Sequence, residues 1–160
     1  MLSEIKGDLF KIGANILVHQ VNCQGAMDDG IALQIRRNLL SRSQYIEYRW
    51  FCEKNDADAL GSVLYSRIGS NRYVASCFAQ EESSRTWRIT DYRALHRCLQ
   101  NVETTARLEG MSVAIPGYIG CGLEGGDWNV VKAIINNVFA ASTVNATIVY
   151  YDEHMILGEE

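Results

Sequence analysis

The fold is decided by ILVHQVNCQGAMDDGIALQI, which spans residues 16–35. Residues 16–21 form a short apolar run with β-branched side chains, which is typical of a buried strand. The chain then enters a loop at 23–30, whose glycines permit unusual backbone angles. A helix is expected to begin near Gly30, because the apolar side chains that follow are spaced so that they share one face. The stretch therefore predicts a buried strand, a glycine loop and an amphipathic helix, in that order.

Apolar patterns further along the chain predict the remaining elements. We expect a short helix at 45–53, a β-hairpin formed by 62–68 and 72–78, a long amphipathic helix at 91–109, a strand at 112–116, a helix from 127 to about 141, and a strand at 146–151. Buried strands that alternate with helices are characteristic of a largely parallel sheet covered on both faces. Because no repeat or linker interrupts the chain, we expect one α/β domain over residues 1–160.

The composition excludes several classes of protein. A chain of 160 residues with 48% hydrophobic residues can form a core without disulfides or metal. Its 15 Lys and Arg against 19 Asp and Glu give a net charge of −4, the wrong sign for holding nucleic acid through its phosphates, so no sequence-specific nucleic-acid binding is expected. No apolar run reaches the ~20 residues of a membrane span, and the first residues lack a signal-peptide pattern. We therefore expect a soluble, cytoplasmic protein that does not associate with membranes.

The five cysteines and three histidines are spread along the chain without the spacing of metal ligands. We expect reduced thiols, no metal and no cofactor.

A second glycine loop, GYIGCGLEGG at 117–126, follows the predicted strand at 112–116. It contains Gly-x-Gly-x-x-Gly at Gly120, Gly122 and Gly125, and glycines let backbone N–H groups approach a phosphate closely. A dinucleotide-binding fold is disfavoured because this pattern lies near the end of the chain, whereas that fold needs it in the first βαβ unit. A purely structural turn remains an alternative.

The first loop carries side chains that suit a ribose. Asn22 offers amide donors and a carbonyl acceptor, and Asp28 and Asp29 offer carboxylates for hydroxyl groups. Capping of the following helix is an equally good interpretation of either aspartate. Near the N-terminus, Asp8 can accept a hydrogen bond from an exocyclic amine, beside the apolar residues Leu9 and Phe10.

Taken together, these motifs resemble the macrodomain family of ADP-ribose-binding modules. The resemblance rests on Gly7-Asp8-Leu9, on Val21-Asn22, on the glycine loop that leads into a helix, and on Ile115-Pro116-x-x-Ile119-Gly120-Cys121-Gly122-Leu123. Met27-x-x-Gly30-Ile31-Ala32 and a tryptophan at 128 are similar to the branch of terminal ADP-ribose glycohydrolases and macrodomain antitoxins. The resemblance implies a three-layer α/β/α fold around a mixed, largely parallel six-stranded sheet.

The resemblance also implies roles for individual residues. Asp8 would hold the adenine amino group beside Leu9, and Asn22 would contact the distal ribose. The first loop, with Gly25, Met27 and Gly30, would cover that ribose and a phosphate. The second loop would hold the diphosphate through the backbone of Ile119, Gly120, Cys121, Gly122 and Leu123. Glu124 falls where the branch carries an acidic catalytic residue, and the implied partner is ADP-ribose or an ADP-ribosylated macromolecule.

One position departs from the branch. Its hydrolases are similar in carrying a lysine near the end of the hairpin's second strand, where this chain has Phe78-Ala79-Gln80-Glu81. Since an amide cannot replace that nucleophile, we expect direct attack by water, with Glu124 or Asp28 as general base and Asn22 at the ribose.

Three alternatives remain at this stage. The chain is an ADP-ribose hydrolase, or removes phosphate from ADP-ribose-1″-phosphate, or reads ADP-ribosylated partners without catalysis. A thiol enzyme built on Cys23 or Cys121 is a further hypothesis, weakened by the absence of an obvious base.

Overall fold

The computed structural model describes residues 1–81 and 89–151 and contains a six-stranded sheet with the order β1-β6-β5-β2-β4-β3. The strands are β1 (Leu2–Lys6), β2 (Ile16–Asn22), β3 (Val63–Gly69), β4 (Arg72–Gln80), β5 (Val113–Pro116) and β6 (Ala146–Tyr150). The helices are α1 (Gly30–Asn38), α2 (Arg42–Asn55), α3 (Tyr92–Glu109) and α4 (Trp128–Phe139), with short 3₁₀ turns η1 (Leu9–Lys11) and η2 (Asp56–Ala59). All strand pairs are parallel except the β3–β4 hairpin.

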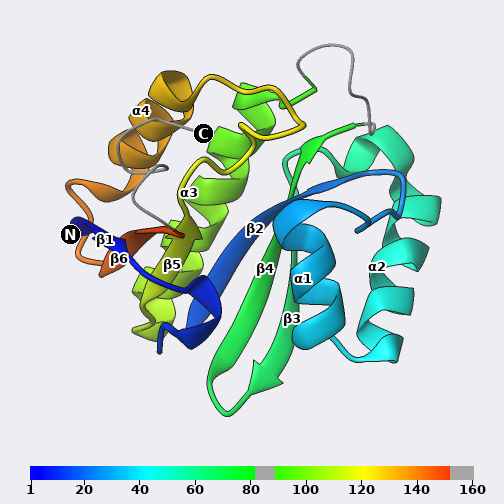
Figure 1. Ribbon diagram of the computed structural model, residues 1–160, viewed down its shortest axis with the longest axis horizontal. Helices are drawn as coiled ribbons and strands as arrows, with labels where there is room; N and C mark the ends of the chain where they lie inside the picture. The colour runs from blue at the N-terminus through cyan, green and yellow to red at the C-terminus, as the bar shows by residue number, and fades with distance from the viewer. Residues whose placement is uncertain (82–88, 152–160) are drawn as a thin grey trace.

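Helices cover both faces of the sheet, as Figure 1 shows. Ile16 and Val18 of β2 pack in one cluster with α3 and α4, whereas Leu17 packs with Ile35 of α1 on the other side. This alternation follows from the two-residue period of a strand. The predicted three-layer α/β/α fold with a mixed, largely parallel sheet is therefore confirmed.

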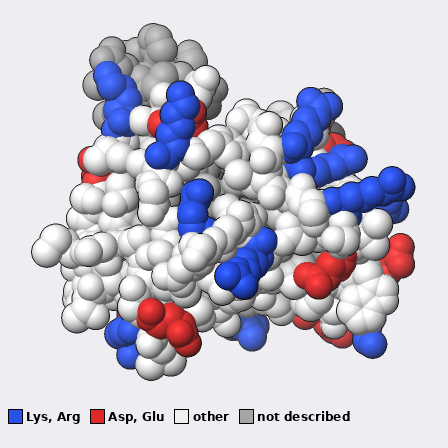
Figure 2. All heavy atoms as spheres, turned by 90° about the horizontal axis from the view of Figure 1, so that it is seen from below, with Lys and Arg blue, Asp and Glu red and all other residues white. Residues whose placement is uncertain are grey.

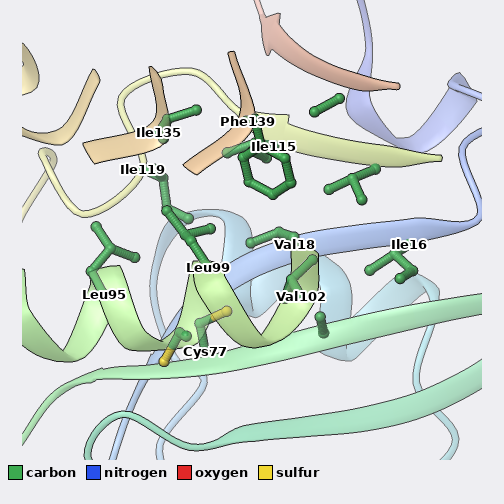
Figure 3. Packing of buried hydrophobic residues seen from close by; sticks show 14 of the residues in the cluster. Ile16, Val18, Cys77, Leu95, Leu99, Val102, Ile115, Ile119, Ile135 and Phe139 are labelled. Carbon is green, nitrogen blue, oxygen red and sulfur yellow. The ribbon is translucent and has the colours of Figure 1, made fainter. Parts of the chain in front are cut away.

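The larger core lies between the sheet and the two helices α3 and α4. In Figure 3, Leu95, Leu99 and Val102 project from α3 toward the sheet and toward Phe139 of α4. All four side chains are fully buried. The helix ends at Gly110, whose left-handed φ of 66° favours glycine, as the sequence predicts.

Two elements differ from the sequence expectation. Strand β1 was not recognised from a local pattern, because four of its five residues are exposed and it has no apolar alternation. Its place comes from long-range pairing, with Leu2 opposite Ala146. Helix α2 begins three residues earlier than expected, at Arg42, because Ser41 and Gln44 form a reciprocal capping box.

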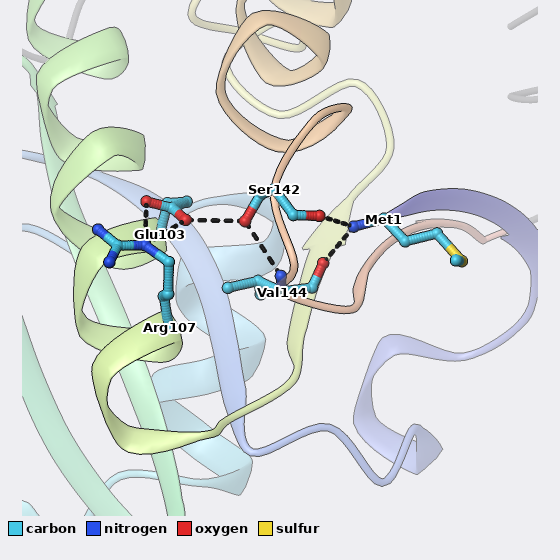
Figure 4. Close-up of polar contacts among 5 residues, drawn as sticks. All are labelled: Met1, Glu103, Arg107, Ser142 and Val144. Atoms are coloured by element: carbon cyan, nitrogen blue, oxygen red, sulfur yellow. Dashed lines mark hydrogen bonds and ion pairs between the residues drawn. The ribbon is translucent and has the colours of Figure 1, made fainter.

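Contacts at the first residue hold β1 against the rest of the molecule (Figure 4). The ammonium group of Met1 donates to the carbonyl oxygens of Ser142 and Val144. The Ser142 hydroxyl donates to the Glu103 carboxylate at 2.7 Å, and Glu103 pairs with Arg107 at 3.1 Å. These contacts connect β1, the segment before β6 and α3.

The sheet order determines where the loops meet. The carboxyl ends of five parallel strands lie at one edge, in the order β1, β6, β5, β2 and β4. Neighbouring strands are ~4.8 Å apart, so β1 and β2 are about 14 Å apart along this edge. The second glycine loop, which follows β5, lies between them. A ligand that touches both ends of this edge must therefore be elongated.

Candidate ligand-binding site

The carboxyl ends of β2 and β4 border a cleft that also receives the two glycine loops. Its lining residues are Gln20, Val21, Asn22, Ala26, Asp28, Asp29, Ala32, Gln80, Ile89, Leu123 and Glu124. Within the described part of the chain, the charged residues of this lining are all acidic. Among these described residues, the groups that can donate to an anion are backbone N–H groups and neutral side-chain amides.

Asn22 organises the first loop. Its side-chain oxygen accepts from the backbone N–H of Gln24 and Ala26 and from the Tyr48 hydroxyl, at 3.1, 3.3 and 3.0 Å. Its Nδ2 donates to the carbonyl oxygen of Ala26 at 2.9 Å. In the part of the chain that the structure describes, the second hydrogen on Nδ2 has no partner and is available to a ligand. Asn22 thus shapes the loop and has one donor for a ribose oxygen.

The two aspartates of the first loop have different surroundings. Asp28 lies 3.3 Å from Arg36 of α1, with its side chain 65% exposed. Asp29 is the N-cap residue of α1, but its side chain makes no capping hydrogen bond. The capping interpretation therefore does not account for either carboxylate. Both line the cleft.

The second loop is a series of tight turns with several backbone donors left over. Tyr118, Gly120 and Gly125 have left-handed φ values of 63°, 73° and 71°. The N–H of Cys121 donates to Tyr118, and that of Gly126 donates to Gly120. Within residues 1–81 and 89–151, the N–H groups of Gly122, Leu123 and Glu124 donate to no protein atom. These donors, rather than Cys121, are free to meet an anion, just before the positive end of helix α4.

A buried polar cluster fixes this loop to the sheet. Gln20 Nε2 donates to Gln80 Oε1 at 2.8 Å and to Thr90 Oγ1 at 2.9 Å, and Thr90 Oγ1 donates to the carbonyl oxygen of Gly120 at 2.7 Å. The backbone N–H of Thr90 donates to the carbonyl oxygen of Glu124 at 3.3 Å. Thr90 therefore holds both ends of the segment 120–124.

The same cluster requires glycine at position 120. A Cβ atom there would lie 2.7 Å from Gln20 Oε1 and 3.1 Å from Thr90 Oγ1. The left-handed backbone of Gly120 adds a second reason. Sequence reasoning gave no structural role to Gln20, Gln80 and Thr90, although Gln20 in a strand expected to be buried was a visible signal.

Gln80 ends the hairpin strand β4, in the region where the resemblance led us to look for a lysine. Gln80 is 6% exposed, and its side-chain oxygen is engaged by Gln20. No lysine lines the cleft among the described residues. The carboxylate of Glu124 lies over its own loop. Its Oε2 is 3.3 Å from the position that a Cβ atom on Gly122 would take.

The thiol-enzyme hypothesis finds no support in the site. Burial raises the pKa of both the Cys23 and the Cys121 thiols to about 12, the opposite of what a nucleophilic cysteine needs. His19 is fully buried beside Ser76, at 2.8 Å between Nε2 and Oγ, and does not line the cleft. Burial lowers the pKa of His19 to about 3.

The β1 end of the sheet edge carries Asp8, the residue expected to bind adenine. Asp8 follows β1, and its Oδ1 accepts from the backbone N–H of Phe10 at 2.9 Å. An aromatic group connects the second loop with α4 and β6: Tyr118 stacks on Trp128 at 4.9 Å, and both rings meet Tyr150 edge-on. The Tyr150 ring covers the backbone of Gly117, where it would collide with any Cβ atom.

Three residues that were expected to contact the ligand have buried side chains, so they could contact it only through their backbone. The side chains of Leu9, Met27 and Ile119 are 5%, 0% and 5% exposed and pack in the hydrophobic clusters. The Leu9 side chain belongs to the core, so the expected contact of Leu9 beside an adenine would involve its backbone. Gly25 and Gly30 adopt left-handed φ values of 81° and 55°, as the loop requires.

The chain is similar in sequence to two characterised proteins, whereas no protein-family model matches it. It is 25% identical over 149 residues to a DNA ADP-ribosyl transferase-DNA ADP-ribosyl glycohydrolase fusion protein of Thermosipho africanus (strain H17ap60334), covering 84% of this chain but 38% of that protein. It is 26% identical over 149 residues to the ADP-ribose glycohydrolase OARD1 of Bos taurus, covering 92% of this chain and 90% of that protein.

Comparison with solved structures identifies the fold. The macrodomain of Mycobacterium tuberculosis DarG superposes with a TM-score of 0.79 at 23% identity, covering 96% of this chain and 99% of that chain. Thermosipho africanus DarTG in complex with ADP-ribose gives a TM-score of 0.77 at 20% identity, covering 96% and 42%. The chain has the macrodomain fold, and the resemblance to that family is confirmed.

The helices give one further finding. None in the described part of the chain is both long and apolar enough to cross a membrane.

Proposed function

We propose that the chain binds ADP-ribose along the carboxyl edge of its sheet and hydrolyses ADP-ribose derivatives without a catalytic lysine. The observation that carries this proposal is the second glycine loop, with the unused N–H groups of Gly122, Leu123 and Glu124 between two sites that suit an amine and a ribose. The relatives named as ADP-ribose glycohydrolases support the ligand class.

The ligand would lie along the edge in one direction. Asp8 accepts from the adenine amino group, the second loop donates to the diphosphate, and the free hydrogen of Asn22 Nδ2 meets the distal ribose. The distance of about 14 Å between β1 and β2 suits an elongated ligand with its anionic part in the middle. Because the loop holds phosphate through dipoles, the acidic lining of the cleft does not prevent binding.

Hydrolysis would proceed by attack of water on the anomeric carbon of the distal ribose. Glu124 accepts a proton from the water as the new C–O bond forms, and the bond from the anomeric carbon to the linked group breaks, so that this group leaves and takes up a proton. We favour Glu124 over Asp28 as the general base, since Asp28 is paired with Arg36. The same geometry serves a protein-linked, nucleic-acid-linked or 1″-phosphate derivative.

The test of binding is calorimetry with ADP-ribose. Saturable binding that Gly122→Val abolishes is expected, because a β-branched side chain would obstruct the loop next to its free N–H groups. An absence of heat change at millimolar ADP-ribose would refute the proposal. Gly13→Val is a suitable control, as a Cβ at Gly13 meets nothing within 4 Å.

The test of catalysis uses Glu124→Gln on ADP-ribosylated substrates and on ADP-ribose-1″-phosphate. A general base contributes roughly 10²–10⁴-fold, so a loss of that size with binding retained is expected. Glu109→Gln, at the exposed end of α3, is the matched control. Tight binding by the unmodified chain without turnover of either substrate would instead identify a reader of ADP-ribosylated partners.

A further inference from the structure

A group of basic side chains lies on the face opposite the cleft. We define the basic face by Lys11, Arg37, Arg42, Arg67 and Arg72. Figure 2 views the molecule from this side: Lys and Arg lie over the middle and the right of the face, and Asp and Glu gather mainly below them. The chain as a whole has a net charge of −4, so this gathering is not a consequence of a basic composition.

Hydrogen bonds connect the segments that carry these five residues. Arg67 Nε donates to the carbonyl oxygen of Gly69 at 3.2 Å, and Gly69 pairs with Arg72 across the β3–β4 hairpin. Arg72 Nη2 donates to the carbonyl oxygen of Ile12 at 3.5 Å, next to Lys11. The basic face is therefore continuous from η1 to the hairpin.

The start of α2 joins the same face. The side chain of Gln44 donates to the carbonyl oxygen of Arg67 at 2.6 Å, which brings the first turn of α2 and Arg42 to the hairpin. Arg37 lies in the last turn of α1, a few residues earlier in the chain. Three separate segments thus contribute cations to one surface.

Within the described part of the chain, these cations have no counterions. None of the five forms an ion pair with any residue in 1–81 or 89–151, whereas Arg36, Arg107 and Lys132 each pair with a carboxylate elsewhere. Arg42 also stands at the first position of helix α2, where the helix dipole is positive and a cation is unfavourable. The arrangement costs stability that a bound polyanion would offset.

We propose that the basic face binds nucleic acid through its phosphodiester backbone, independently of base sequence. Four of its five residues are arginine, whose planar fork of donors matches phosphate oxygens. Cations spread over three segments suit a linear series of phosphates better than a single small anion. Net charge did not predict this surface, because the acidic residues are distributed elsewhere.

The basic face and the cleft are separate. Arg72 begins β4 and Gln80 ends it, and eight residues of strand span ~26 Å. Nucleic acid on the basic face would leave the cleft open, and this inference does not depend on the proposed hydrolase function.

The experiment is fluorescence anisotropy of the unmodified chain with labelled single- and double-stranded DNA of unrelated sequences, between 20 and 200 mM salt. For up to five phosphate contacts, the slope of log K against log salt is expected to reach roughly −4.5 on duplex and −3.5 on single strands. Arg42→Gln with Arg67→Gln should weaken binding at least tenfold and reduce the duplex slope by about 2.

Arg93→Gln, an exposed arginine of α3 outside the basic face, tests for a general effect of charge and should leave the affinity unchanged. The inference is overturned if the chain fails to bind DNA at 20 mM salt, if the double variant binds as well as the unmodified chain, or if binding depends on base sequence. Binding to vesicles of anionic lipid with none to DNA would overturn it in favour of a membrane surface.

Discussion

Lowering the pH should reduce the free energy of unfolding through the buried histidine of β2. His19 is 1% exposed, and its Nε2 lies 2.8 Å from Ser76 Oγ. Burial holds the pKa of its ring at about 3 in the folded chain, against an ordinary value of 6.5. Between these two values the unfolded chain binds a proton that the folded chain does not. The free energy of unfolding must therefore fall as the pH decreases through this window, and it is unaffected by His19 above pH 6.5.

The magnitude follows from the width of the window. Each pH unit contributes ~1.4 kcal/mol, so lowering the pH from 6.5 to 4.5 should remove about 3 kcal/mol through His19 alone. That is a large part of the ~5–15 kcal/mol that stabilises a typical domain.

The assay is urea unfolding at several pH values for the unmodified chain and for His19→Gln. Glutamine keeps a polar group near Ser76 but does not titrate. As the pH falls through this interval, the free energy of unfolding of His19→Gln should decline less steeply than that of the unmodified chain, by about 1.4 kcal/mol per pH unit. Carboxylates affect both proteins alike, which makes the difference between the curves the informative quantity. Parallel curves between pH 6.5 and 4.5 would refute the reasoning, as would an NMR titration showing the His19 ring protonated near pH 6.

Denaturant unfolding of three further variants tests the packing of the site and the capping of helix α2. Gly120→Ala combines a left-handed backbone with a clash against Gln20, so it should lower the free energy of unfolding by about 2–4 kcal/mol. Gly110→Ala has a left-handed φ but open space around its Cβ, so it should lower the free energy of unfolding by about 1–2 kcal/mol. Equal losses in the two variants would contradict the clash. Tyr48→Phe removes hydroxyl donation to Asn22 at 2.9 and 3.0 Å and should cost about 1–2 kcal/mol; an unchanged midpoint would show that these bonds contribute nothing. Ser41→Ala removes the N-cap of α2 and should cost about 1 kcal/mol, with Ser70→Ala in the exposed hairpin turn as control.

Local patterns predicted those parts of the fold in which local chemistry is strong. Helix α3 has regular apolar spacing, an N-cap at Asp91 and a glycine stop at Gly110, and it forms as expected. The β3–β4 hairpin has a Gly-Ser-Asn turn between two β-rich runs and also forms. Strand β1 has neither signal, because pairing with β6 rather than its own residues makes it a strand.

The candidate site was predictable only in part, for a similar reason. Glycine loops at strand ends are visible in a sequence, and they located the cleft beside Asn22 and Glu124. The cluster of Gln20, Gln80 and Thr90 was not predictable, since its members are far apart in the chain and each alone is an ordinary polar residue. The burial of the Leu9 side chain was not predictable either, because a motif does not say which of its residues face the core.

The pairing of β1 with β6 has a consequence for synthesis on the ribosome. Leu2 lies opposite Ala146, so β1 cannot pair with β6 until the ribosome has made the residues between them. At roughly 5–20 residues per second, that delay is on the order of ten seconds, during which the nascent chain carries an unpaired β1. The Asp8 end of the ligand edge is therefore completed last, after the cleft beside β2 and β4 has all of its strands.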